Sequence, residues 1–392
     1  MTRRDRPSGW QVLALGTIAN PRLGGNYRNS STPSARPLIK MGNIARVSID
    51  LTRLDYIVPS EQTLPEHRLH YGDVLLNTRN TLDLVGKVSI WRDELPLAYY
   101  NSNILRLEFT EPYCGSSGYF GYALNAQRSI DAIRALATGT TSVAAIYTRD
   151  LLKLTVLVPP KAEQLRIASA LADCDDLIAS LKRTITKKEA IKHGMMQALL
   201  TGKTRLPGFT REWKPRRLSE LLRYEQPGPF LVRTTTQLGN GRIPVLTAGK
   251  TFLLGYTNES TGIYRAHPIV IFDDFTTASQ FVDFDFKAKS SAIKILSARP
   301  DANIRFLYER MQLIRWPLGD HKRYWISEYS QQTIDVPHPV EQDAIAEVLQ
   351  ECADEIMTLD LRLIKARAVK QGMMQELLTG RTRLPIMEQV AA

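Results

Sequence analysis

A repeated stretch at residues 159–207 places the strongest constraint on how this chain folds. Its first copy opens with Glu163-Gln164 and closes with Gly194-Met195-Met196-Gln197-Ala198-Leu199-Leu200-Thr201-Gly202. The second copy opens with Glu341-Gln342 and closes with Gly372-Met373-Met374-Gln375-Glu376-Leu377-Leu378-Thr379-Gly380. Position 341 minus position 163 is 178, and position 385 minus position 207 is also 178, so no net insertion separates the copies. Solenoid units are short and stack directly on one another, whereas this spacing predicts one module duplicated within a single chain.

Apolar residues in both copies recur at alternating spacings of four and three, which is typical of the a/d seam of paired helices. Pro160 suits a first helical turn, and Gly202 and Gly380 suit the ends of helices. Each helix is expected to run about 40 residues, or about 60 Å. Because the two cysteines of the repeat lie on the seam, we interpret them as small buried apolar residues rather than reactive thiols. The seam residues are Ile167, Leu171, Cys174, Ile178 and Leu181 in the first copy and Ile345, Leu349, Cys352, Ile356 and Leu359 in the second.

Two regions of differing sequence lie outside the repeat, and Trp10 and Trp213 open them. Short β-rich runs separated by turn residues predict strands at 73–76, 85–91, 103–109, 151–158, 243–247, 268–272 and 292–296. Apolar spacing predicts helices at 119–136 and 304–314. We therefore expect an α+β chain in four segments. These are a mixed α/β domain at 1–157, a repeat helix within 158–208, a second mixed domain at 209–335 and a second repeat helix within 336–392.

The charge balance favours a polyanionic partner. The formal net charge is +11, from 51 basic and 40 acidic residues, and such an excess suits phosphate contacts and long-range steering. A soluble protein that simply happens to be basic is the alternative. The three cysteines show no metal-ligand spacing, and we find neither a signal peptide nor an apolar stretch long enough to span a membrane. We expect a soluble, cytoplasmic protein.

Sequence signatures of catalysis are weak. Gly249-Lys250-Thr251 resembles the end of a phosphate-binding loop, but Pro244 occupies the position where that loop requires glycine. The Asn/Asp-Pro-Pro-Tyr/Phe signature of amino-methyltransferases does not occur. Asp274, Asp285 and Lys287 follow the carboxylate-carboxylate-lysine order of some metal-dependent nucleases. That order is short and common by chance, and solvated strand or turn carboxylates explain it better. A metal nuclease therefore stays open as an alternative, as does a coiled-coil scaffold without any role in nucleic-acid binding.

Both variable regions carry clusters of side chains suited to nucleic acid. Amide, guanidinium and hydroxyl groups bond to base edges and phosphates, although ordinary surface or capping roles explain any one residue as well. The candidate DNA-binding residues are Asn77, Thr78, Arg79, Asn80, Tyr100 and Asn101 in the first region, and Thr247, Lys250, Thr276, Thr277, Ser279, Lys289, Ser290, Lys322, Arg323 and Tyr324 in the second.

The repeated stretch resembles the conserved helices of type I restriction-modification specificity subunits, the HsdS family. The resemblance is carried by Glu163-Gln164-x-x-Ile167-Ala168, by Gly194-Met195-Met196-Gln197-x-Leu199-Leu200-Thr201-Gly202 and by their second copies. The stretches Thr247–Thr251, Phe272–Ser279 and Lys289–Lys294 are similar to one common class of target-recognition domain. The resemblance covers nearly the whole chain.

The resemblance implies two target-recognition domains separated by two long helices that form an antiparallel coiled coil. Each domain is expected to recognise one half of a bipartite, asymmetric site in double-stranded DNA. The chain itself is expected to be non-catalytic and to bind neither metal nor cofactor. Its expected partners are two methyltransferase (HsdM-type) subunits and restriction/translocase (HsdR-type) subunits, which carry S-adenosylmethionine, ATP and Mg²⁺. The paired helices are expected to set the spacer within the DNA site and to dock the methyltransferase subunits.

Overall fold

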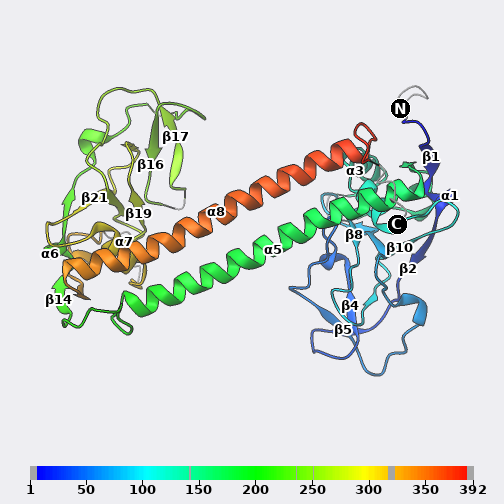
Figure 1. Ribbon diagram of the computed structural model, residues 1–392, viewed down its shortest axis with the longest axis horizontal. Coiled ribbons are helices and arrows are strands. Elements are labelled where there is room, and N and C mark those ends of the chain that lie inside the picture. The colour runs from blue at the N-terminus through cyan, green and yellow to red at the C-terminus, as the bar shows by residue number, and fades with distance from the viewer. Residues whose placement is uncertain (1–6, 141–142, 235, 250, 317–322, 386–392) are drawn as a thin grey trace, which may run out of the picture. The chain divides into compact units, whose positions relative to one another are not determined.

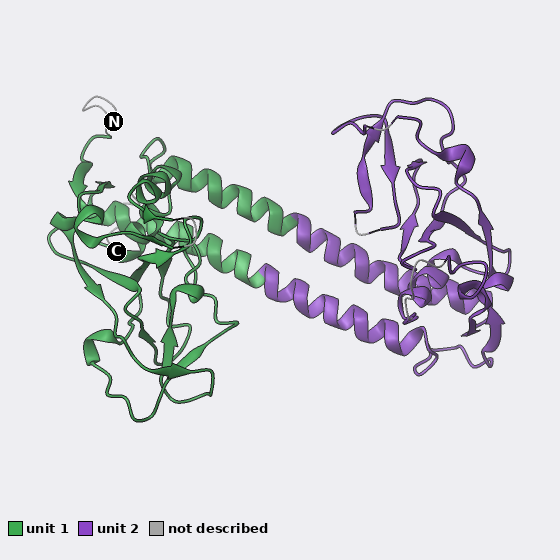
Figure 2. Cartoon of the chain, turned by 180° about the vertical axis from the view of Figure 1, so that it is seen from behind, with its two compact units in different colours: residues 1–180, 362–392 green, residues 181–361 purple. Residues whose placement is uncertain are grey.

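The structure, a computed structural model, describes residues 7–140, 143–234, 236–249, 251–316 and 323–385. Figure 1 shows the order of its elements along the chain. The chain divides into two compact units (Figure 2). Unit 1 comprises residues 1–180 and 362–392, and unit 2 comprises residues 181–361. The first unit is therefore discontinuous in sequence, whereas the second is continuous.

Two long helices, α5 (Lys161–Leu199) and α8 (Pro339–Leu377), are each 39 residues long. Each helix contributes one part to each unit, because the division falls after residue 180 in α5 and after residue 361 in α8. In unit 1 the first part of α5 meets the last part of α8, where Cys174 Sγ lies 3.5 Å from Met373 Sδ. In unit 2 the last part of α5 meets the first part of α8, where Lys188 and Glu355 form an ion pair at 2.7 Å. The helix parts thus run antiparallel within each unit, which confirms the predicted fold class.

The seam residues lie on the inner faces of these helix pairs. Ile167 and Leu171 are at most 1 % exposed in unit 1, as are Ile345 and Leu349 in unit 2. They pack into the cores of the adjacent globules rather than only against the opposite helix. Cys174 and Cys352 are half-buried free thiols. The remaining seam residues, Ile178, Leu181, Ile356 and Leu359, are buried or half-buried.

Unit 1 is built around a four-stranded antiparallel sheet in the order β2 (Ala19–Leu23), β10 (Ile104–Phe109), β6 (Val74–Asn77) and β8 (Val88–Ile90). A two-stranded sheet joins β1 (Gln11–Ala14) to β13 (Thr155–Val158). Two smaller sheets contain β11 (Thr138–Gly139), β12 (Ala144–Ala145) and β7 (Arg79–Asn80), and β3 (Asn29–Ser30), β5 (Asp55–Ile57), β4 (Pro37–Ile39) and β9 (Tyr99–Tyr100). The helices outside the repeat are α1 (Leu15–Ile18), α2 (Ser117–Leu124), α3 (Gln127–Ala135) and α4 (Thr148–Leu151).

Unit 2 repeats this framework with a different sequence. Its four-stranded antiparallel sheet has the order β15 (Leu222–Glu225), β21 (Ile293–Ala298), β18 (Ile269–Asp273) and β19 (Ser279–Val282). Its two-stranded sheet joins β14 (Lys214–Arg217) to β22 (Thr333–Val336), and its third sheet has the order β17 (Leu253–Thr257), β16 (Ile243–Leu246) and β20 (Lys287–Ala288). The short helices are α6 (Leu218–Leu221) and α7 (Ile304–Gln312). The duplication therefore extends into the globules, although only their ends look alike in sequence.

Several predicted elements are shorter in the structure, such as the strand expected over 85–91, which is β8 (Val88–Ile90), and two others differ more. The helix expected over 119–136 is two helices, α2 and α3, because α2 stops at Leu124 and Asn125 bonds back to the Gly121 carbonyl and across to Val88. The strand expected over 151–158 begins only at Thr155, since Leu151 still belongs to α4. Among the described residues, no helix combines the length and the apolar character needed to cross a membrane.

Candidate nucleic-acid interface

Several of the predicted DNA-binding residues lie together at one end of the main sheet of unit 2, where β18 ends and β21 begins. We refer to this end of the sheet as an edge. The turn after β18 and the segment before β21 lie at this edge, because Asp274 donates its backbone N–H to the Ala292 carbonyl at 3.0 Å. Thr247 adjoins the same edge, since the Lys289 N–H bonds to the carbonyl of its neighbour Leu246 at 3.0 Å. Arg323 joins them by placing its guanidinium 5.8 Å from the centre of the Phe275 ring. We call this surface the unit 2 edge and define it as Thr247, Phe275, Thr276, Thr277, Lys289, Ser290 and Arg323.

The turn that displays Phe275 and Thr276 is held by hydrogen bonds within the turn. The Asp273 carboxylate accepts the N–H groups of Phe275 and Thr276, both at 2.9 Å. Thr277 adopts a left-handed conformation with φ of 56°, which is uncommon for a β-branched residue and marks a strongly constrained position. Phe275 and Thr276 are both exposed. The turn therefore presents an aromatic ring and a hydroxyl to solvent on a rigid support.

Unit 1 has an edge at the equivalent place in its own sheet. Thr78, directly after β6, donates its N–H to the Asn103 carbonyl at 2.9 Å, just as Asp274 does after β18. Arg79 is exposed, and Asn80 and Asn101 are half-exposed. The amides have local partners, because the Asn80 side chain accepts from Thr81 N–H and the Asn101 side chain accepts from Asn103 N–H. Arg79 and these amides form the unit 1 edge.

Five candidate contact residues are buried, which corrects the expectation that their side chains contact DNA. They are Asn77, Thr78, Tyr100, Ser279 and Tyr324, and none is more than 9 % exposed. Their polar groups bond inside the protein: the Asn77 amide to the Leu84 carbonyl and the Lys87 N–H, for example, and Ser279 to Gln312. Burial also raises the pKa of Tyr100 to about 12. Lys250 and Lys322, two further candidates, lie outside the described residues.

The nuclease-like pattern does not assemble into one site. Asp274 pairs with Lys294 at 3.2 Å, and Asp285 with Arg265 and His267. Lys287 pairs with Glu259 at 2.9 Å and bonds to the Thr261 carbonyl. Throughout the described ranges, no three His, Cys, Asp or Glu side chains are grouped so as to hold a metal ion. The geometry thus gives no support to the metal-nuclease alternative.

A buried carboxylate at the start of each long helix ties the helix pair to its globule. Glu163 accepts a hydrogen bond from Trp10 Nε1 at 3.1 Å and a two-point ion pair from Arg383 at 3.0 and 2.7 Å. Glu341 receives the same two-point pair from Arg205 at 2.6 and 2.7 Å. Hydrogen bonding to these carboxylates raises the pKa of both arginines. These residues belong to the repeated motif, but the motif does not predict that each glutamate pairs with an arginine more than a hundred residues away.

The glutamine that follows each of these glutamates bonds to two backbone groups in the same way in both copies. Gln164 accepts the Gly115 N–H at 2.9 Å and donates to the Pro159 carbonyl at 2.9 Å. Gln342 accepts the Asn303 N–H at 2.9 Å and donates to the Pro337 carbonyl at 3.0 Å. The Glu-Gln pair is therefore the joint between globule and helix in both units.

The two junctions differ further along the helices. In unit 1, Asp175 of α5 is bonded by Lys370, Tyr122 and Arg92. Burial acts to raise the pKa of Asp175, but these hydrogen bonds outweigh it and the pKa is lowered. In unit 2 the repeat places Ala353 at the equivalent position, and Lys192 instead pairs with Glu309 of α7 at 3.7 Å. The acidic partner thus lies on the helix in one unit and on the globule in the other.

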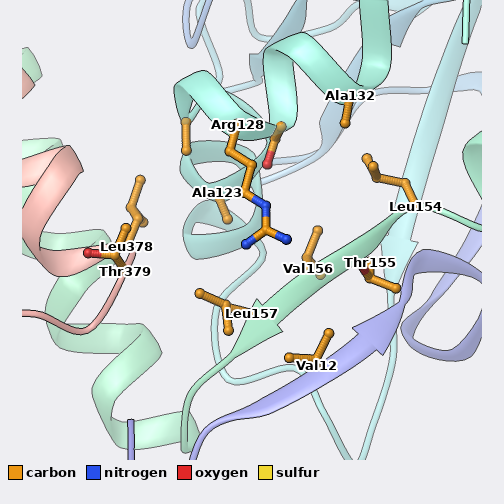
Figure 3. A pocket seen from close by; sticks show the side chains of 12 residues that line it. Val12, Ala123, Arg128, Ala132, Leu154, Thr155, Val156, Leu157, Leu378 and Thr379 are labelled. Carbon is orange, nitrogen blue, oxygen red and sulfur yellow. The ribbon is translucent and has the colours of Figure 1, made fainter. Parts of the chain in front are cut away.

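A pocket of about 380 Å³ lies in unit 1, between the β1–β13 sheet, the α2–α3 region and the residues that follow α8. In Figure 3, Arg128 extends from its helix toward Val156 and Leu157. The lining contains no carboxylate, imidazole or thiol, so the pocket lacks the groups needed for acid-base or nucleophilic chemistry. Its lining residues are Val12, Ala123, Ala126, Arg128, Ser129, Ala132, Leu154, Thr155, Val156, Leu157, Leu378 and Thr379.

Solved structures share this architecture. The chain superimposes on the crystal structure of a type I restriction-modification S subunit from M. genitalium with a TM-score of 0.67 and 14% identity, over 97% of both chains. It also matches a chain from a structural study of assembly and conformational transition in a type I R-M system, with a TM-score of 0.54 and 13% identity, over 96% of this chain and 99% of that one. These likenesses define the class as two-globule chains with paired long helices and the fold of type I S subunits.

Sequence similarity is stronger but shorter. The chain is 50% identical over 140 residues to the Escherichia coli type I restriction enzyme EcoR124I/EcoR124II specificity subunit, over 34% of each protein. It is 28% identical over 201 residues to the putative type I restriction enzyme MjaX specificity subunit of Methanocaldococcus jannaschii, over 50% of this chain and 46% of that relative. No family model matches the chain. The matches span about a third and just under a half of these relatives' own lengths. With the shared fold, these partial matches make the chain similar to type I specificity subunits, the HsdS family.

Proposed function

We propose that this chain is the non-catalytic DNA-recognition subunit of a type I restriction-modification complex, in which each unit reads one half of a bipartite, asymmetric DNA site. The observation that carries the proposal is the duplicated framework with different edges. Unit 1 presents Arg79 and amide groups where unit 2 presents Phe275, Thr276 and Arg323. Two scaffolds of one topology with different edge chemistry suit two different base sequences.

The helices serve as spacer and docking surface in this proposal. Antiparallel pairing gives the repeat an approximate twofold relationship, which suits two copies of one partner. The proposed partners are two methyltransferase (HsdM-type) subunits together with restriction (HsdR-type) subunits. S-adenosylmethionine, ATP and Mg²⁺ belong to those subunits, and the assembly acts in the cytoplasm. The net charge of +11 supports binding to a polyanion.

Co-expression with the cognate methyltransferase subunit, followed by genome-wide mapping of methyladenine, tests the proposal. A two-part motif with a fixed gap is the expected result. Methylation without a two-part motif would contradict the assignment of one half-site to each unit. Incubation of the purified chain with DNA and Mg²⁺ separates the alternatives, since a recognition subunit binds with strongly salt-dependent affinity and cleaves nothing. A scaffold without a nucleic-acid role binds no DNA at all.

A further inference from the structure

The interior of unit 2 contains an ion pair directly beneath its edge. Asp274 and Lys294 are each 1 % exposed, and their charged groups lie 3.2 Å apart. Lys294 is the second residue of the inner strand β21, between Ile293 and Ile295. Burying two charges is costly, and an apolar pair of similar volume is often as stable. The stability of the sheet therefore does not explain why a charged pair occupies this place.

Unit 1 shows that the fold does not require this pair. Thr78 occupies the place of Asp274, because Thr78 bonds through its N–H to Asn103 and through its carbonyl to Ile146, as Asp274 bonds to Ala292 and Tyr324. Leu105 occupies the place of Lys294, because it follows Asn103 by two residues as Lys294 follows Ala292. Leu105 is 1 % exposed. A hydroxyl and an aliphatic side chain thus satisfy the same framework.

The ion pair connects three segments that end at the unit 2 edge. One Asp274 oxygen accepts the Trp325 N–H at 2.8 Å while the other faces Lys294. The Asp274 carbonyl accepts the Tyr324 N–H at 2.9 Å. Lys294 donates to Gln226, just beyond β15, at 3.1 Å. The turn bearing Phe275, the segment bearing Arg323 and the end of β15 are consequently held by one pair of charges.

We propose that the buried Asp274–Lys294 pair is a positioning element that fixes the DNA-reading geometry of unit 2, so that base discrimination in one half-site depends on it. Asp274 immediately precedes Phe275, and Trp325 follows Arg323 by two residues. The Asp274 carboxylate therefore sets the spacing between the exposed Phe275 ring and the exposed Arg323 guanidinium. Because a buried charge with directional hydrogen bonds tolerates few arrangements, the pair selects one conformation of the edge. The inference rests on the proposed function and adds the residues that set its specificity.

The test replaces the pair with its unit 1 counterpart in the full chain, as Asp274→Thr/Lys294→Leu, co-expressed with the cognate methyltransferase subunit. Mapped methyladenine should retain the unit 1 half-site, while discrimination at one or more bases of the unit 2 half-site falls by about tenfold, within the range of one base mismatch. An unchanged unit 2 half-site overturns the inference. Absence of a two-part motif for the unsubstituted chain overturns the proposed function itself, so the two failures are distinguishable.

A second variant, Asp274→Asn/Lys294→Met, keeps an acceptor for the Trp325 N–H and a linear apolar chain in place of Lys294. Base discrimination in the unit 2 half-site should be closer to that of the unsubstituted chain in this variant than in the first variant. The matched control is Lys287→Met/Glu259→Gln, which removes the ion pair between buried Lys287 and half-buried Glu259 in unit 2 and should leave the motif unchanged. Loss of all methylation in both Asp274 variants, with lowered thermal stability, would identify a folding element and overturn the positioning role, as would an altered motif in the control.

Discussion

Arg383 holds Glu163 in a two-point ion pair although 220 positions separate them in sequence. Arg205 holds Glu341 in the same geometry over 136 positions. In each case the residue just after one long helix bonds to the residue near the start of the other. The pairing closes each unit with residues from both copies of the repeat. Neither copy forms a complete joint by itself.

Substitution of Glu163 should destabilise the protein more than substitution of Glu341. Glu163→Ala leaves the Trp10 indole N–H buried without its acceptor, and an orphaned buried donor costs about 1–3 kcal/mol. The Trp213 indole N–H has no hydrogen-bond partner in the described part of the chain, so Glu341→Ala orphans no such donor. Thermal or urea unfolding of the two variants measures the difference. Equal losses would show that the indole bond contributes nothing.

Acidification should weaken unit 1 through Asp175. Its pKa is lowered from the ordinary value of 3.8, so its stabilising contribution is complete above about pH 5 and is lost as pH falls through 3.8 toward the lowered pKa. Asp175→Asn should therefore flatten the decline in unfolding free energy below about pH 4. The exposed neighbour Asp173 provides the control, because Asp173→Asn should preserve the steep decline. A parallel decline in the Asp175 variant and the unsubstituted protein would contradict this prediction.

Helix length should set the spacer of the DNA site. One heptad inserted after Arg183 and another after Leu361, equivalent positions of the repeat, keeps the seam in register. It adds about 10.5 Å at 1.5 Å per residue, or about three base pairs at about 3.4 Å each. Methyladenine mapping should show the same half-sites with a wider gap. An unchanged gap would show that helix length does not set the spacer. A heptad inserted in only one helix should abolish methylation, because the seam residues of the two helices would no longer match.

Arg323 and Arg79 should contribute to DNA affinity through exposed guanidinium groups. If Arg323 contacts phosphate, Arg323→Ala should weaken binding uniformly and reduce the slope of log affinity against log salt by about one. If it contacts a base, the loss should be about 1–3 kcal/mol and confined to one position of the unit 2 half-site. Arg79→Ala should act in the same way on the unit 1 half-site. Lys187→Ala on α5 is the control, and unchanged binding in both arginine variants would remove these residues from the interface.

The extent of the helices was predictable because their information is local. Alternating spacings of four and three, with Gly202 and Gly380 beyond the ends, predict about 40 residues, and both helices have 39. The joints were not predictable, since Glu163 meets Trp10 and Arg383 only after the whole unit has folded. A heptad pattern identifies a buried face but not which distant residue covers it.

The candidate DNA-binding residues were chosen from their polar side chains, and the sequence did not predict which of them are exposed. Polar composition alone marked Thr78, Ser279 and Tyr324 as surface residues, whereas strand pairing and local hydrogen bonds bury them. Lys294 shows the opposite case, because it is a charged residue that lies buried within an apolar strand. The run Ile293-Lys294-Ile295 did contain a signal. Lys294 interrupts a near-continuous apolar run, which is typical of a strand buried on both faces, and a lysine in such a strand requires a buried acceptor such as an aspartate of the same domain.

The discontinuity of unit 1 has a consequence for how the protein is made. A ribosome completes residues 181–361, the whole of unit 2, before it synthesises the α8 segment that packs into the core of unit 1. Until Leu377, Leu378 and Arg383 emerge, the nascent first globule has an uncovered apolar face and an unpaired Glu163. The first globule to begin synthesis is thus the last to close. Premature termination in the part of α8 beyond residue 361 would therefore release a chain with a finished second globule and an aggregation-prone first one.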